Sequence, residues 1–548
     1  MSQIQQFYAG QNIFITGGTG FLGKMLTEKL LRSCREIGTI YLLIRGKKGK
    51  SVEERRDALL AESVFDVLRK DQPNFFEKIV CIVGDVAEER FGLTVTDYAR
   101  LVDEVSVIFH LAATVHFNEK LEVALSINVK SVKSVIDIAR ECKNLKVGVY
   151  VSTAYSHCVR KAIDEKLYPS PCESYEEVKS IISKAKADEL SEDMTMAILG
   201  KWPNTYSFSK AIAEGVVDEF AKDLPFAIFR PSIVSSSYEE PTPGWMPSPI
   251  GMLGIVYAYI LGIMHVISAD PDAVADIIPV DYTCNALISC AWASSKKCHY
   301  KDVSVYNYVS GKEKPIIWKQ FVRKFDTAAT FYPSEKAIYH HFCMVTKSKL
   351  LFYILEMCFQ LIPALIIDKL STLLGKQSQL YKVISKIGIH SRIYSYFSIR
   401  EWDFENREIQ QLWKQLEPED KKIFPFSMET VDWDEYCLFA AKGFRKFISL
   451  ESDANLEQAR QKHRRLFIVH QLLSMALGIL ILWVVWKLFG GFYLMFSTVY
   501  QLRATSNVFH VTSAHCLKNL ITMINTFIIT KCLSIIPTFN MLNSLVNG

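Results

Sequence analysis

A tyrosine followed four residues later by a lysine is a spacing that can move protons. On a helix the two side chains share one face. The ammonium can then lower the pKa of the phenol and also hold a sugar hydroxyl. A carbonyl group that receives a hydride needs such a donor, because its oxygen becomes an alcohol. The spacing occurs four times, at Tyr175/Lys179, Tyr206/Lys210, Tyr308/Lys312 and Tyr332/Lys336.

The neighbouring segments of the chain distinguish the four pairs from one another. Only Tyr206 and Lys210 run into an expected helix, residues 211–223, that leads directly to an apolar strand, residues 226–230. The other pairs lie in a polar insert or beyond the expected sheet. We predict that Tyr206 and Lys210 are catalytic and that both also contact the cofactor.

A second hydroxyl should orient the carbonyl oxygen, and the end of the preceding strand can supply it. That segment, residues 149–155, reads VYVSTAY. Thr153 is the first choice, Ser152 is the competitor, and a surface or capping role is the alternative for both. Cys158 could accept an acyl group, but no histidine or cationic partner is evident in the sequence, so a packed thiol is expected.

A glycine-rich turn precedes these residues in the chain. It follows a short apolar segment and opens a helix that runs to Leu31, with glycines three residues apart. Such a turn lets the backbone approach a pyrophosphate, which then lies against the free N–H groups of the helix start. The residues predicted to bind a dinucleotide here are Thr16, Gly17, Gly18, Thr19, Gly20, Phe21, Leu22 and Gly23.

The end of the second strand should contact the adenosine ribose. Folds specific for NAD place an acidic residue there, whereas this chain has Arg45, with Lys47 two residues on. Because arginine binds phosphate in a bidentate manner, we predict NADPH rather than NADH. A solvated basic turn is the alternative. Other residues expected beside the cofactor are Asp85, Val86, Leu111, Ala112, Ala113, Asn128, Pro231 and Ile233.

These residues need a sheet to position them. Short runs rich in Val, Ile and Phe alternate with stretches of helical length, which predicts an α/β fold with a doubly wound parallel sheet of the Rossmann type. The expected strands are residues 12–16, 39–44, 78–83, 105–111, 146–152 and 226–230.

Beyond the expected sheet the chain continues into a substrate-binding part and a helical domain. We expect the reductase domain to cover residues 1–340, with a substrate-binding part over about 235–340. Residues 250–268 carry no formal charge and predict a buried or lid-forming substrate helix, with membrane contact as the alternative. Residues 345–450 should form a helical C-terminal domain, with no chemistry of its own visible in the sequence.

The clearest membrane signal is residues 466–486, which contain no charged side chain and are long enough for a transmembrane helix. Basic residues precede the segment, so its N-terminal side should face the cytosol. In the tail, residues 487–548, a second membrane segment over 517–542 is left open because Lys531 interrupts it.

Composition excludes several other classes of protein. A net charge of +5 over 548 residues, without a basic run, argues against nucleic-acid binding. The thirteen cysteines are scattered, which indicates reduced thiols and predicts neither a disulfide framework nor a metal site. The N-terminus has no secretory signal, so a cytosol-facing catalytic domain is expected.

The motifs together resemble the extended short-chain dehydrogenase/reductase superfamily, and within it the alcohol-forming fatty acyl-CoA reductases with their male-sterility-type C-terminal domain. The matching pieces are the glycine turn, residues 152–155 (STAY), the Tyr206/Lys210 pair, residues 230–234 (RPSIV), 41–45 (YLLIR), 243–245 (PGW), 276–281 (DIIPVD) and 402–404 (WDF).

This resemblance implies that NADPH reduces a long-chain acyl-CoA in two hydride steps through a bound aldehyde, with loss of CoA. Thr153 and Tyr206 would hold the oxyanion, and Tyr206 would supply the final proton. It also implies a peroxisomal or endoplasmic reticulum membrane, and a homodimer is left open. The alternatives are a two-electron reductase, which makes an aldehyde or oxidises a sterol, and a silent lipid-binding protein.

Overall fold

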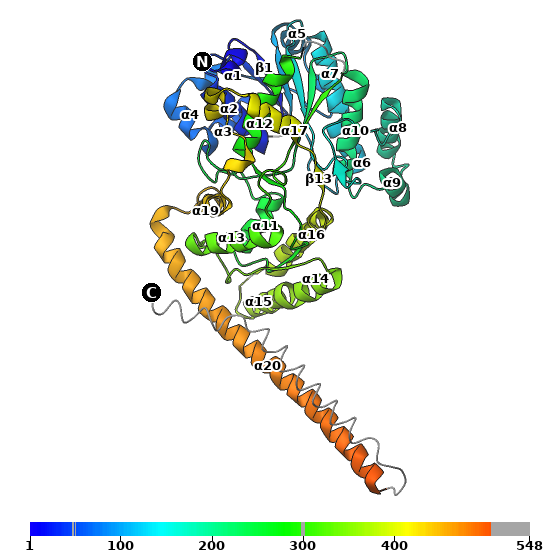
Figure 1. The fold of residues 1–548 in the computed structure, drawn as a ribbon, viewed down its shortest axis with the longest axis vertical. Coiled ribbons are helices and arrows are strands. Elements are labelled where there is room, and N and C mark those ends of the chain that lie inside the picture. The colour runs from blue at the N-terminus through cyan, green and yellow to red at the C-terminus, as the bar shows by residue number, and fades with distance from the viewer. Residues whose placement is uncertain (47–48, 50, 298–301, 377, 506–548) are drawn as a thin grey trace. The chain divides into compact units, whose positions relative to one another are not determined.

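The computed structural model describes residues 1–505 apart from 47–48, 50, 298–301 and 377. Residues Met1–His470 form one compact unit, and Gln471–Gly548 belong to a second. The centre of the first unit is a seven-stranded parallel sheet (Figure 1). Its strands are β1 (Ile13–Thr16), β2 (Ile40–Ile44), β3 (Ile79–Val83), β4 (Val107–His110), β5 (Val147–Val151), β7 (Phe226–Pro231) and β11 (Ser304–Tyr308).

The strand order is β11-β7-β5-β4-β1-β2-β3. From β1 the chain builds the sheet outward through β2 and β3, and then returns to β4 on the other side of β1. The order therefore reverses between β1 and β4. Ligands of open parallel sheets bind beyond the carboxyl ends of the strands at such a reversal. The predicted doubly wound fold is confirmed, and β11 is a strand that the sequence pattern did not indicate.

Helices cover both faces of the sheet because alternate side chains of each strand point to opposite sides. Ile13 and Ile15 belong to one buried cluster and Phe14 to another. The first cluster includes side chains of α2 (Phe21–Ser33) and α12 (Val280–Ser295), and the second includes side chains of α7 (Ser131–Glu141) and α10 (Thr205–Phe220).

The helix that carries Tyr206 begins earlier than its apolar pattern suggests. The side chain of Asn204 caps α10 by accepting a hydrogen bond from the Ser207 N–H at 2.9 Å. Satisfying this free N–H fixes the start of the helix at Thr205 rather than near residue 211. Tyr206 and Lys210 therefore lie on its first two turns.

The remaining elements surround this core. The N-terminal ones are α1 (Gln3–Tyr8), α3 (Val52–Leu60), α4 (Asp66–Asp71), α5 (Val95–Glu104) and α6 (Leu121–Leu125). The polar insert holds β6 (Ala162–Ile163), α8 (Tyr175–Lys186) and α9 (Glu192–Leu199). After β7 come β8 (Ile233–Ser235), α11 (Met252–Ile260), β9 (Val266–Ser268), β10 (Ile277–Pro279), α13 (Trp318–Phe331) and β12 (Met344–Thr346).

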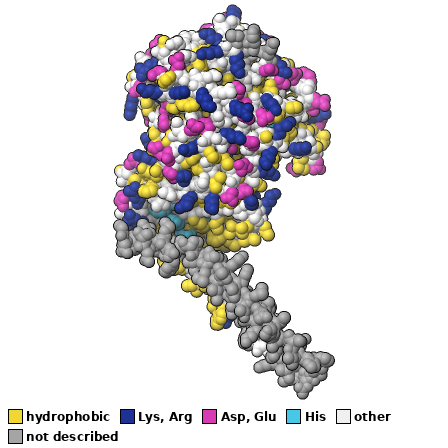
Figure 2. Space-filling model, viewed as in Figure 1, with side chains coloured by type: hydrophobic (Ala, Val, Ile, Leu, Met, Phe, Trp, Pro, Cys, Tyr) yellow, Lys and Arg dark blue, Asp and Glu magenta, His cyan; other side chains and the backbone are white. Residues whose placement is uncertain are grey.

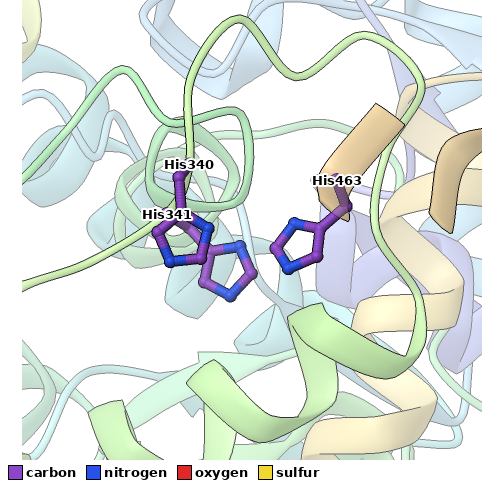
Figure 3. A group of neighbouring side chains, drawn as sticks. All are labelled: His340, His341 and His463. Atoms are coloured by element: carbon purple, nitrogen blue, oxygen red, sulfur yellow. The ribbon is translucent and has the colours of Figure 1, made fainter. Parts of the chain in front are cut away.

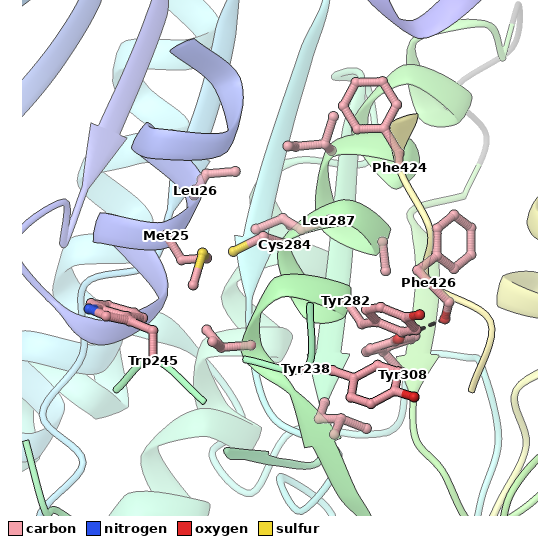
Figure 4. Packing of buried hydrophobic residues seen from close by; sticks show 14 of the residues in the cluster. Met25, Leu26, Tyr238, Trp245, Tyr282, Cys284, Leu287, Tyr308, Phe424 and Phe426 are labelled. Atoms are coloured by element: carbon pink, nitrogen blue, oxygen red, sulfur yellow. Dashed lines mark hydrogen bonds between the residues drawn. The ribbon is translucent and has the colours of Figure 1, made fainter. Parts of the chain in front are cut away.

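The C-terminal helices pack into the same unit as the reductase. They are α14 (Lys349–Glu356), α15 (Ile362–Leu373), α16 (Leu380–Ser398), α17 (Arg407–Gln415), α18 (Pro418–Ile423) and α19 (Trp433–Gly443), with β13 (Asp403–Phe404) between α16 and α17. Phe424 and Phe426 lie in the same buried cluster as Tyr308 of β11, and Figure 4 shows Phe426 next to this tyrosine. The Tyr308 hydroxyl donates to the Phe426 carbonyl at 2.7 Å, so the two regions share one core.

Two stretches of the described residues are long and apolar enough to cross a membrane, Lys349–Leu373 and Asp453–Lys487. The predicted segment 466–486 lies in the second, within α20 (Leu456–Thr505). In the first, a π-helical turn (Met357–Leu361) joins α14 to α15, and many of its apolar side chains are exposed, such as Leu350 and Leu373. Figure 2 shows a hydrophobic area in this part of the molecule, below the charged surface of the reductase. The open question of residues 517–542 lies outside the described residues.

Candidate active site

The glycine turn forms a cradle that side chains would fill. Gly17 has a φ of +74°, and a Cβ atom there would lie 2.7 Å from the Ala112 nitrogen. A Cβ atom on Gly23 would lie 2.3 Å from the Gly17 carbonyl oxygen. Glycine is therefore required at both positions, and backbone N–H groups at the start of α2 are left open to a ligand. This geometry fits the pyrophosphate of a dinucleotide.

The other predicted residues of the turn run from Thr16, the last residue of β1, to the first turn of α2. Gly18 packs against Leu42, and the Phe21 ring lies 5.7 Å from the ring of Trp245. Thr16 forms a hydrogen bond of 2.6 Å with Nδ1 of the buried His110. Burial lowers the pKa of His110 to about 3, with the Lys210 charge as a smaller cause, so the imidazole is neutral.

Arg45 follows β2 and has an exposed side chain, 68% accessible. Its Nη1 lies 3.6 Å from a carboxylate oxygen of Asp85, which follows β3. The other oxygen of Asp85 accepts from the Ala87 N–H at 3.0 Å. The structure thus brings Arg45 and Asp85 together at the carboxyl end of the sheet. The predicted Lys47 lies outside the described residues.

Tyr206 is half-buried, and its ring stacks on Phe117 with centroids 5.4 Å apart. Burial raises the pKa of Tyr206 to about 12, and a side-chain hydrogen bond with Thr153 partly offsets the rise. The phenol is therefore protonated at neutral pH, as a proton donor must be. The expected lowering of this pKa by the ammonium is absent, because the Lys210 Nζ instead donates to the Val151 carbonyl at 2.8 Å.

Lys210 lies against the ring of Tyr150, with Nζ 4.8 Å from the centroid. Burial lowers the pKa of Lys210 to about 7, against the attraction of Glu214, which raises it. A buried amine near neutrality gains its proton readily when an anionic ligand binds beside it. The other three Tyr/Lys spacings lie elsewhere, and Tyr308, for example, is in the core.

The structure separates the two candidate hydroxyls. Thr153 lines the cavity described below. The Ser152 hydroxyl is buried and donates to Oε1 of Glu214 at 2.5 Å. Thr153 is thus placed to meet a substrate, whereas Ser152 holds an internal carboxylate.

Glu214 is a residue that the sequence did not single out. It is fully buried on α10 and ion-pairs with Arg230, whose Nη2 lies 2.6 Å away. His157 and Ser156 also bond its carboxylate, at 3.1 and 2.9 Å. Desolvation alone would raise the Glu214 pKa, but the charges and hydrogen bonds of Arg230 and His157 together outweigh it and hold this pKa well below its usual range. The network fixes α10, and with it Lys210, against the ends of β5 and β7. Only the spacing of Glu214 from Lys210 on one helix face could have suggested it.

Asn128 joins the loop after β4 to α10. Its amide exchanges two hydrogen bonds with the backbone of Thr114 and donates a third to the Ser209 hydroxyl at 2.9 Å. Because these groups are already bonded, Asn128 positions the loop and the helix. Of the remaining predicted residues, Pro231 ends β7 and Ile233 lines the cavity.

A cavity of about 1160 Å³ adjoins the tyrosine. Its wall includes Tyr206, Thr153 and Phe117, and it continues over apolar side chains of α11, α13 and α16, such as Ile255, Phe321 and Phe397. The predicted substrate helix over 250–268 is thus a shorter helix, α11, and a strand. Cys158 is buried, and desolvation raises the pKa of its thiol to about 11, so it is a packed thiol as predicted.

The fold, the glycine cradle and the Tyr206/Lys210 pair define a nicotinamide-dependent oxidoreductase with a Rossmann-type sheet. The fold is shared with reductase domains of known structure. The terminal R domain from the myxalamid PKS-NRPS biosynthetic pathway is 19% identical, with a TM-score of 0.55, over 80% of this chain and 91% of that one. The reductase domain of a nonribosomal peptide synthetase from Mycobacterium tuberculosis is 17% identical, with a TM-score of 0.52, over 82% and 97%.

Sequence comparison assigns the chain to a narrower group of reductases. Two family profiles described as male sterility protein match residues 15–287 and 359–451. "Fatty acyl-CoA reductase wat" of Drosophila melanogaster is 34% identical over 86% of this chain and 90% of its own length. Human "Fatty acyl-CoA reductase 1" is 35% identical over 89% and 94%. The chain belongs to the fatty acyl-CoA reductase family.

Proposed function

We propose that this protein reduces long-chain fatty acyl-CoA to fatty alcohol with two molecules of NADPH and releases CoA. The observation that carries the proposal is the position of Tyr206 and Thr153 in the wall of a large, mainly apolar cavity. An acyl chain needs such a lining, and its thioester carbonyl needs the two hydroxyls. The family of the chain supports the same substrate class.

The cofactor, when bound, supplies one hydride to the carbonyl carbon in each half of the reaction. Thr16–Gly23 would hold its pyrophosphate and Lys210 its nicotinamide ribose. Arg45 supports the choice of NADPH, because its exposed guanidinium stands where an adenosine 2′-phosphate would be recognised. Asp85 lies 3.6 Å from that guanidinium and would keep it in place.

Thr153 and Tyr206 act on the carbonyl oxygen. In the first half they donate hydrogen bonds to the oxyanion of the tetrahedral hemithioacetal, which collapses and expels the CoA thiolate. The thiolate takes its proton from solvent, and a fatty aldehyde remains. In the second half Tyr206 transfers its proton to the aldehyde oxygen as that carbon is reduced. A phenol with a pKa of about 12 holds this proton until the alkoxide forms.

Counting NADPH oxidised per CoA released tests this proposal. Purified full-length protein in detergent is given a long-chain acyl-CoA, and thiol and NADPH are followed together. We expect a ratio of two and a fatty alcohol as product. A ratio of one with free aldehyde supports the two-electron reductase instead. A sterol oxidised by the same preparation without any acyl-CoA turnover contradicts the proposal outright.

We also propose that the catalytic unit faces the cytosol on a peroxisomal or endoplasmic reticulum membrane. Basic residues at 462, 464 and 465 precede the apolar part of α20, as expected for a cytosolic flank. The exposed apolar side chains of α14 and α15 would rest in the same bilayer, because they would otherwise face water. In cells permeabilised only at the plasma membrane, an epitope tag at Met1 should be accessible to antibody. A tag reached only after the organelle is opened contradicts this orientation.

A further inference from the structure

Three histidines meet outside the active site. His340 and His341 lie between α13 and β12, and His463 lies on the part of α20 that belongs to the unit of residues 1–470. Figure 3 shows the three imidazole rings gathered between the loop and the helix. One ring nitrogen from each residue lies within 4.8 Å of the others. The rings of His341 and His463 have centroids 4.8 Å apart and are inclined by only 19°.

The cluster has unused coordinating capacity. Nδ1 of His340 is buried and has no hydrogen-bond partner in the described part of the chain. Burial, with a smaller contribution from neighbouring histidines, lowers the pKa of His340 to about 3 and that of His341 to about 4. Both rings are thus neutral at physiological pH, which is the form that binds a metal ion.

A carboxylate lies beside one of the three rings, that of His341. Oδ1 of Asp326, on α13, is 3.5 Å from Nε2 of His341 and also accepts from the Tyr259 hydroxyl at 2.5 Å. Thr330 is the other polar neighbour, with its hydroxyl 3.4 Å from the same nitrogen. The nearby His470 is already hydrogen-bonded to the Tyr339 hydroxyl at 3.0 Å. Three imidazoles and one carboxylate would give the four ligands of a tetrahedral site.

We propose that His340, His341 and His463 bind a divalent zinc-like ion, with Asp326 as the fourth ligand. Imidazole nitrogen suits zinc and its neighbours among the transition metals, whereas magnesium and calcium take oxygen ligands. Ring nitrogens around tetrahedral zinc stand roughly 3.4 Å apart, given Zn–N bonds of about 2.0–2.1 Å. The ring nitrogens, which lie within 4.8 Å of one another, would have to draw closer by up to about 1.4 Å to close on the ion.

The ion would be structural. It would tie the first turns of α20 to the loop before β12 and to α13. Tyr259 and Phe325 line the cavity, and Tyr259 bonds directly to Asp326, so the ion would also stiffen one wall of the acyl pocket. The sequence predicted no metal site, because two adjacent histidines and a third more than a hundred residues later form no recognisable ligand spacing.

Metal analysis of the full-length protein tests the site. The protein is purified in detergent through a tag without histidines, stripped with chelator and titrated with Zn²⁺ or Co²⁺. We expect about one ion per chain, a Co²⁺ visible spectrum of four-coordinate type and a higher Tm with Zn²⁺. His463→Gln should weaken binding by at least about 100-fold, because losing even an outer hydrogen-bond partner costs about 10–100-fold.

Two further variants make the result specific. His390→Gln removes an exposed histidine of α16 that is not in the cluster, and it should bind Zn²⁺ like the unaltered protein. His340→Gln provides a second ligand loss, since His340 is less buried than His341. NADPH binding by each variant reports that it is folded. Unaltered protein that shows no Zn²⁺-dependent rise in Tm, or a His463→Gln variant that binds Co²⁺ with unchanged affinity and spectrum, overturns the proposal. Both readouts are independent of acyl-CoA reduction.

Discussion

The Ser152 hydroxyl donates to the Glu214 carboxylate at 2.5 Å, while the next residue, Thr153, lines the substrate cavity. Successive residues at the end of β5 point in opposite directions, as they do along a strand. One hydroxyl therefore supports the buried network of α10. The other makes only long hydrogen bonds, to the Pro231 carbonyl at 3.5 Å and from the Tyr155 N–H at 3.3 Å, and lies in the cavity wall where a carbonyl oxygen could meet it. Substitution of the two should have different consequences.

Thr153→Val should lower kcat by roughly 100-fold, the cost of removing one oxyanion donor, with little change in Tm. Ser152→Ala should instead lower the free energy of unfolding by about 1–3 kcal/mol, because a buried carboxylate loses a donor. Its folded fraction should keep most of its activity. Steady-state kinetics and thermal unfolding of both variants measure this contrast. Equal losses of kcat would mean that Ser152 also touches the substrate.

Tyr206→Phe should reduce kcat by about 100- to 10,000-fold, since the proton donor is lost. The ring would still stack on Phe117, so the Kd for NADPH should change little. Fluorescence titration of NADPH, run beside the activity assay, separates the two effects. Tyr155→Phe is the control, because Tyr155 lines the same cavity without a place in the proposed chemistry. A fully active Tyr206→Phe variant would remove the phenol from the mechanism.

Binding of NADPH should be coupled to proton uptake by Lys210. Its pKa of about 7 lies well below the ordinary value for lysine because the amine is buried. Roughly one pH unit above that pKa, the Lys210 amine of the free protein is mostly uncharged. The anionic cofactor favours the charged form of this amine. The affinity for NADPH should therefore fall as the pH rises through 7. Calorimetry in buffers of different ionisation enthalpy measures the uptake, which Lys210→Met should abolish.

Arg45→Ala should raise the KM for NADPH by about 10- to 100-fold and leave that for NADH nearly unchanged. The size follows from a charge-assisted hydrogen bond of about 1.5–3 kcal/mol to the 2′-phosphate. Arg69→Ala, at an exposed arginine of α4, is the matched control. Equal effects of Arg45→Ala on both cofactors would show that this arginine does not distinguish them.

The sequence predicted the sheet well because most of its strands are short, buried runs of apolar residues. The expected strand over 39–44, for instance, is β2, Ile40–Ile44. It did not predict β11, whose segment begins beside polar residues and is buried by its pairing with β7 and by the packing of α12 and α17. The start of α10 was also misplaced, since the Asn204 cap and not the apolar pattern determines it.

The candidate site was predictable only where the chemistry has a fixed spacing. The glycines and the Tyr206/Lys210 pair lie close together in the chain, and each spacing has a physical reason. Glu214 and Arg230 meet through the packing of α10 on β7, and Phe117 reaches Tyr206 from a separate loop. These contacts form because the sheet order brings distant segments together, and no local sequence pattern predicts that order.

The wall of the cavity comes from both regions that the family profiles recognise separately. Phe117 and Tyr206 belong to the first, and Tyr394 and Phe397 of α16 belong to the second, with the Phe117 ring 5.1 Å from Tyr394 and 5.4 Å from Phe397. Both regions of the chain should therefore determine which lengths of acyl chain the cavity accepts. A chimera that exchanges only one region between two relatives would take one part of the cavity wall from each. Its preference for acyl-chain length should then match neither parent.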